Sequence, residues 1–134
     1  MMTTVLVIDD DPSICLFFTE LLTHMAFESE TANTLKDAET KLDSRAFDLV
    51  LLDLELPDGN GLELMPKINK SSGNPEIIII TGTGDARGAE LAFKYGAWDY
   101  VQKPFLLDEV SLPITRALQY RKEKQSVKAA VPLV

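Results

Sequence analysis

Two short stretches decide the fold, VLVIDDD at residues 5–11 and LVLLD at residues 49–53. Each is a continuously apolar run that ends directly in aspartate, which is typical of a strand buried on both faces of a parallel sheet. Asp9, Asp10 and Asp53 would then be crowded together at one edge of that sheet. Like charges at such a site raise one another's pKa and destabilise the fold unless a cation offsets them, and Mg²⁺ is the hard, oxygen-binding ion that explains them most economically. A metal beside an exposed carboxylate indicates phosphoryl-transfer chemistry.

Strand-like and helix-like patterns alternate along the whole chain. Strands are expected near residues 5–8, 27–32, 47–52, 77–80 and 99–102, and helices near residues 12–25, 35–42, 62–68, 85–95 and 108–124. Asp11, which precedes Pro12, is interpreted as a helix N-cap, and Thr34 as the cap of the second helix. Five strands that alternate with five helices predict an α/β fold, a doubly wound parallel sheet with helices on both faces.

Polar residues follow four of these expected strands. In doubly wound sheets, sites form at the carboxyl ends of strands where the winding direction reverses. Asp9, Asp10, Asp53, Thr81 and Lys103 all stand at such ends. Taken alone, Thr81 could bond its own backbone and Lys103 could be a surface cation. Five such residues converging on one edge favour a functional site.

The composition limits the classes of function. The chain of 134 residues fits one domain, and its formal net charge of −8 argues against nucleic-acid binding by this domain. The basic stretch 116–128 is interpreted as a solvated helix end. No apolar run is long enough to span a bilayer, and no signal peptide is evident. The single Cys15 fits a reducing cytoplasm, where it is expected to be a buried, small apolar residue.

Four motifs carry a resemblance to a known family. They are VIDDDP at residues 7–12, LLDLELPDGNG at 51–61, IITG at 79–82 and GAWDYVQKPF at 96–105. In this order and at these separations they resemble the receiver domains of two-component response regulators, over about residues 4–122. The resemblance implies the flavodoxin-like receiver fold, a five-stranded parallel sheet of order 2-1-3-4-5 with five helices.

The resemblance also implies a role for each site residue. Asp53 would be the phosphoacceptor, attacking the phosphorus of a phosphohistidine in a sensor kinase. Asp10 would ligate Mg²⁺ directly and Asp9 mainly through water, while Asp53 and the backbone carbonyl of Glu55 complete the protein's ligands. Thr81 would donate a hydroxyl, and Lys103 an ammonium, to the phosphoryl oxygens.

Further positions are implied to switch or tune the site. Lys103-Pro104 would be a cis peptide bond, and Tyr100 the aromatic that turns inward when Thr81 moves towards the phosphoryl group. The side chains of Glu55 and Thr83 are expected to set the lifetime of the phosphorylated form. Such a domain is a signalling receiver and not an enzyme, apart from its own phosphorylation and dephosphorylation at Asp53.

The second half of the chain looks like the N-terminal receivers of NtrC-type, sigma-54-dependent activators with AAA+ domains. Residues 1–124 are therefore expected to be the receiver, and residues 125–134 a linker or C-terminal tail. The expected partners are a sensor histidine kinase, a second copy of the chain and a downstream output domain that controls transcription. The alternative is a complete single-domain receiver that acts by protein–protein contact or in a phosphorelay.

Other functional classes fit less well. A dehalogenase-type phosphatase needs a general acid two residues after its nucleophile, where Glu55 is a poor match, and a cap domain for which the chain has no room. In a flavodoxin-like cofactor binder, residues 9–11 would repel a phosphate. An inactive receiver would have lost an acceptor or a ligand, and none is missing. Trp98 stays open as a partner contact or as packing. His24 is interpreted as a surface or half-buried residue and not as a phosphorelay group.

Overall fold

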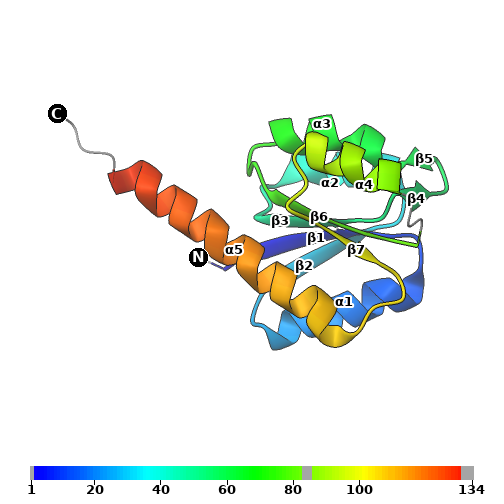
Figure 1. Cartoon of the computed structure of the whole chain (residues 1–134), viewed down its shortest axis with the longest axis horizontal. Coiled ribbons are helices and arrows are strands. Elements are labelled where there is room, and N and C mark those ends of the chain that lie inside the picture. The colour runs from blue at the N-terminus through cyan, green and yellow to red at the C-terminus, as the bar shows by residue number, and fades with distance from the viewer. Residues whose placement is uncertain (1, 83–85, 131–134) are drawn as a thin grey trace.

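The computed structural model describes residues 2–82 and 86–130, which form a sheet between two layers of helices (Figure 1). The parallel sheet has the order β2-β1-β3-β6-β7, which is the predicted order 2-1-3-4-5 when only its own strands are counted. Its strands are β1 (Thr4–Ile8), β2 (Glu28–Ala32), β3 (Leu49–Leu52), β6 (Glu76–Thr81) and β7 (Asp99–Gln102). The predicted fold class is thus confirmed.

Two layers of helices cover the sheet. Figure 1 shows α1 and α5 on one face and α2, α3 and α4 on the other. The helices are α1 (Pro12–His24), α2 (Leu35–Ser44), α3 (Met65–Lys70), α4 (Ala86–Lys94) and α5 (Leu107–Ala130). No helix in the described part of the chain is long and apolar enough to cross a membrane.

Alternate side chains of the inner strands fill two separate apolar cores. The core under α2, α3 and α4 receives Leu6, Ile8, Val50, Leu52, Ile77 and Ile79. The core under α1 and α5 receives Val5, Val7, Leu49, Leu51, Ile78 and Ile80. Because both faces of each inner strand are buried, these strands are continuously apolar and do not alternate with polar residues. The more polar β2 lies at the sheet edge, as predicted.

The segment between β3 and α3 contains two short strands that the sequence did not predict. β4 (Glu55–Leu56) and β5 (Gly59–Asn60) form a two-stranded antiparallel hairpin, which a short 3₁₀ helix, η1 (Gly61–Leu64), follows. Gly61 is required here because a Cβ at this position would lie 2.3 Å from the carbonyl oxygen of Asp53. The hairpin is therefore held against the end of β3.

Side chains cap the first two helices as the sequence predicts. The Asp11 carboxylate accepts a bond of 2.8 Å from the Ser13 N–H at the start of α1. The Thr34 hydroxyl accepts a bond of 3.0 Å from the Asp37 N–H at the start of α2. Both bonds satisfy amide groups that have no partner within the helix.

The last helix is longer and more tightly anchored than predicted. α5 continues to Ala130, and Figure 1 shows its second half extending beyond the layers of the domain. Arg121 is buried, which corrects the interpretation of its stretch as wholly solvated. Its guanidinium forms ion pairs with Asp48 (3.2 Å) and Glu76 (3.3 Å), just before β3 and at the start of β6. α5 thus runs antiparallel to the strands, from their carboxyl ends to their amino ends.

Candidate functional site

Backbone hydrogen bonds fix the residues that follow the strands. The Asp53 N–H donates to the carbonyl of Ile8 over 2.9 Å, and the Lys103 N–H donates to the carbonyl of Thr81 over 2.9 Å. Each bond extends the pairing of two neighbouring strands by one residue. The side chains of Asp53 and Lys103 therefore project from the rigid sheet and not from a free loop.

Lys103 lies between two buried carboxylates. Its Nζ is 2.7 Å from Oδ2 of Asp9 and 3.1 Å from Oδ2 of Asp53. The aspartate side chains are only 3% and 6% exposed, so water screens these ion pairs poorly and their attraction is stronger than at a surface. One ammonium compensates for two carboxylates, which leaves one negative charge in excess.

Backbone amides hold the second oxygen of each carboxylate. The Asp11 N–H donates to Oδ1 of Asp9 over 2.9 Å. The Glu55 N–H donates to Oδ1 of Asp53 over 3.1 Å. Both aspartates are thus fixed in orientation, with Oδ2 directed towards Lys103.

The environment changes the pKa of two members of this group. Burial raises the pKa of Asp9, although the hydrogen bond from Lys103 opposes the change. Burial acts to lower the pKa of Lys103, but the hydrogen bond to Asp9 and the attraction of the Asp53 carboxylate outweigh it, and the net pKa is raised. Lys103 therefore stays charged, while Asp9 holds its proton more readily than an exposed aspartate does.

The exposed Asp10 adds a third carboxylate. One side-chain oxygen from each of Asp9, Asp10 and Asp53 lies within 4.8 Å of the others. Such a set of hard oxygen donors with negative charge in excess fits a magnesium ion better than a softer metal. The cleft at this edge is lined by Asp10, Asp11, Asp53, Glu55, Leu56, Pro57, Gly82 and Lys103.

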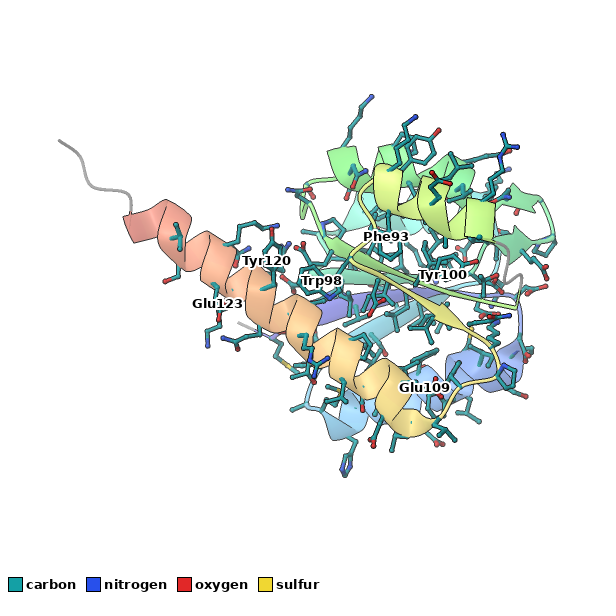
Figure 2. The ribbon with its side chains drawn as sticks, viewed as in Figure 1. Phe93, Trp98, Tyr100, Glu109, Tyr120 and Glu123 are labelled. Carbon is teal, nitrogen blue, oxygen red and sulfur yellow. The ribbon has the colours of Figure 1, made fainter. Side chains whose placement is uncertain are left out.

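The two residues expected to switch lie in neighbouring strands. Thr81 is fully buried at the end of β6. Tyr100 is half-buried in β7, where it packs against the core under α2, α3 and α4 (labelled in Figure 2). The Lys103-Pro104 peptide bond is cis. Thr83, expected to tune the site, falls outside the described residues.

Two residues that support Asp9 were not predicted from the sequence. The Asn33 side-chain amide donates to the Asp9 carbonyl over 2.9 Å, and the Cys15 Sγ lies 3.3 Å from the same oxygen. Cys15 is buried as expected. The sequence gives no local sign of these contacts, because they connect the end of β1 with α1 and with the loop after β2.

Other residues of interest lie away from this edge. The Trp98 ring stacks on Tyr120 of α5 with 4.7 Å between ring centroids, so Trp98 packs within the domain (Figure 2). His24 is exposed at the end of α1.

Comparison with known proteins identifies the family. The model of the response regulator receiver domain matches residues 5–114. The response regulator ArlR of Staphylococcus aureus is 35% identical over 126 residues, which are 94% of this chain and 57% of ArlR. The chain therefore spans little more than half the length of this relative.

Solved structures agree with this match. A CheY-like receiver domain protein of Methanospirillum hungatei superposes with a TM-score of 0.87 at 27% identity, covering 92% of this chain and 99% of the other. The beryllofluoride-activated NtrC4 receiver domain dimer gives 0.83 at 34% identity, with 90% and 99% covered. NtrX of Brucella abortus gives 0.87 at 30% identity, with all of this chain but 32% of NtrX covered. By motif order, strand topology and these likenesses, the chain belongs to the response regulator receiver domain family.

Proposed function

We propose that Asp53 accepts a phosphoryl group from the phosphohistidine of a sensor histidine kinase. The observation that carries this proposal is the position of the Asp53 carboxylate, buried at the end of β3 with Lys103 at 3.1 Å and with Asp9 and Asp10 beside it. An acid at this place costs stability, which a structural role alone does not explain. A role as phosphoacceptor beside an open cleft explains why a buried, charged carboxylate is present here despite this cost.

We further propose that Asp9, Asp10 and Asp53, with the backbone carbonyl of Glu55, hold Mg²⁺. The fit rests on the three clustered carboxylates and on their excess negative charge. When bound, the ion supplies positive charge that offsets the carboxylates and stabilises charge on the phosphoryl oxygens.

The side chains of the chain then have distinct tasks in the transfer. An Asp53 oxygen forms a bond to phosphorus as the phosphorus–nitrogen bond to the kinase histidine breaks, and the imidazole leaves with the electron pair. The Lys103 ammonium neutralises a phosphoryl oxygen, and the Thr81 hydroxyl donates a hydrogen bond to another. Because Lys103 already contacts Asp53, its charge is in place before transfer.

The contacts of Thr81 with the phosphoryl group also lead to a conformational change. When Thr81 moves towards the phosphoryl group, Tyr100 turns inward and changes the surface formed by α4, β7 and α5. This surface serves a homodimer or an output domain, through a shift between two existing conformations.

The wider role is proposed from the likeness to NtrC4 and NtrX. Residues 1–124 act as the receiver, and residues 125–134 begin a linker to a downstream AAA+ domain that controls sigma-54-dependent transcription in the cytoplasm. The continuation of α5 to Ala130 supports this, because a helix that extends past the domain is suited to joining two units.

One experiment tests the acceptor. Wild type, Asp53→Asn and Asp43→Asn are incubated with acetyl phosphate and Mg²⁺, and intact masses are measured. Wild type and Asp43→Asn, which changes an exposed aspartate of α2, gain one phosphoryl mass. Asp53→Asn gains none, because an amide of the same shape is not a nucleophile. A normal yield in Asp53→Asn, with circular dichroism unchanged, contradicts the assignment.

A further inference from the structure

The β4–β5 hairpin is bound to a helix that follows a different strand. Asp58 lies between β4 and β5, and its carboxylate accepts two backbone bonds from the start of α2. Oδ1 accepts from the Leu35 N–H at 2.8 Å, and Oδ2 accepts from the Lys36 N–H at 3.1 Å. Both oxygens are thus used, and 22 or more residues separate the partners along the chain.

This contact completes the capping of the free amide groups at the N-terminus of α2. Thr34 already satisfies the Asp37 N–H, and Asp58 satisfies the amides of Leu35 and Lys36. A carboxylate is favoured at this place because the first amides of a helix present partial positive charge. The backbone bonds to Leu35 and Lys36 also lower the pKa of Asp58, so the carboxylate remains ionised near neutral pH.

The same hairpin carries the residue that orients the acceptor. Glu55 pairs with Asn60 across the hairpin, and its N–H donates to Oδ1 of Asp53. The carbonyl of Glu55 is the backbone ligand in the proposed metal site. Only four residues lie between Asp53 and Asp58, so Glu55 and Asp58 belong to the same short segment of the chain.

We propose that Asp58 is a positioning residue for phosphoryl transfer: by binding the start of α2 it holds the β4–β5 hairpin, and with it Glu55, in place beside Asp53. The proposal rests on the proposed function, since it concerns the metal and acceptor at that site. Asp58 is exposed and lies outside the cleft, and capping of α2 alone would not give it this positioning role.

Thr34→Ala offers a matched control for Asp58→Ala. Each variant removes side-chain capping from the same helix, but only Asp58→Ala releases the hairpin. Asp58→Asn is the conservative variant, because its amide oxygen can still accept from the Leu35 N–H while its NH₂ group cannot accept from Lys36.

The test measures three quantities in wild type and the three variants. They are the Mg²⁺ dissociation constant by calorimetric titration, the rate of phosphorylation by acetyl phosphate with Mg²⁺ at saturation, and hydrogen exchange of the amides of residues 55–60. Asp58→Ala is expected to weaken Mg²⁺ binding by about tenfold, the lower end for loss of an indirect support of a metal site. It also speeds exchange across the hairpin. Thr34→Ala is expected to leave the Mg²⁺ dissociation constant and the hairpin exchange at wild-type values. Asp58→Asn is expected to give values between those of wild type and Asp58→Ala.

The outcomes distinguish a failure of the proposed role of Asp58 from a failure of the proposed function. If Asp58→Ala and Thr34→Ala change Mg²⁺ affinity, phosphorylation and hairpin exchange equally, Asp58 only caps α2 and the inference is overturned. If wild type itself neither binds Mg²⁺ nor becomes phosphorylated, the proposed function fails, while the exchange of residues 55–60 still reports whether Asp58 holds the hairpin.

Discussion

Lys103 is the residue on which the charge balance of the site depends. It is the partner of both Asp9 and Asp53, whose side chains are almost completely buried. Removing one member of a buried ion pair leaves an uncompensated charge, and this loss is larger than the net contribution of the pair. The lysine therefore stabilises the two buried carboxylates as well as serving the proposed transfer.

We expect Lys103→Met to lower the free energy of unfolding by about 3 kcal/mol without metal. Mg²⁺ at millimolar concentration should restore more stability to this variant than it adds to wild type, because the ion then replaces the missing cation. Thermal melts with and without Mg²⁺ measure both effects. Lys70→Met, which changes an exposed lysine, should stay within about 0.5 kcal/mol of wild type. Equal melting of Lys103→Met and wild type would show that the carboxylates do not need the lysine.

At the scale of single elements, Arg121 determines where α5 lies. Besides its ion pairs with Asp48 and Glu76, the guanidinium donates to the carbonyls of Gly73 (2.7 Å) and Asn74 (2.8 Å). These acceptors belong to two segments at the amino ends of the strands, Asp48 before β3 and residues 73–76 at the start of β6. A lysine could not reproduce this set, because only the planar guanidinium offers five donors in a fixed arrangement.

Arg121→Met should therefore destabilise the domain by about 3 kcal/mol, since Glu76 and two carbonyls lose a buried partner. The neighbouring Lys122→Met is the control, because Lys122 is exposed and should change stability by less than about 0.5 kcal/mol. Urea unfolding followed by circular dichroism measures both. A change in Arg121→Met no larger than in Lys122→Met would contradict the anchoring role.

The elements also show what could be predicted from sequence and what could not. The alternation of apolar runs with helical patterns predicts a parallel sheet, and the end of each run located Asp9 and Asp53, whereas the strand order was implied by the resemblance to receiver domains. The hairpin β4–β5 was missed because strands of two residues have no periodicity. The burial of Arg121 and the bonds of Asp58 depend on partners distant in sequence, for which a charged residue gives no local signal.

At the scale of the whole molecule, the proposed activation concerns the surface formed by α4, β7 and α5. Phe93 in α4 and Tyr95 just after this helix are substantially exposed, at 48% and 43%. Apolar rings on a surface favour association when a partner covers them. A dimer is the state named for the activated NtrC4 receiver, and for this chain it is a prediction.

We expect beryllofluoride with Mg²⁺ to shift wild type towards dimer in sedimentation velocity runs. Thr81→Ala should shift much less, because it lacks the hydroxyl that we propose binds the phosphoryl analogue. A population shift of this kind needs only a few kcal/mol of preference for one conformation. Identical sedimentation of wild type in both conditions would count against a dimer switch, and would leave contacts with an output domain as the response.

The direction of α5 places the end of this helix far from the proposed phosphoryl-transfer site. The helix begins close to Lys103, at the edge of the proposed phosphoryl-transfer site, and it passes Arg121 at the opposite edge before extending away. Anything attached beyond α5 is thus carried on the far pole of the molecule. We therefore expect that a bulky phosphodonor and a bulky downstream unit can bind at the same time, at opposite ends of the strands.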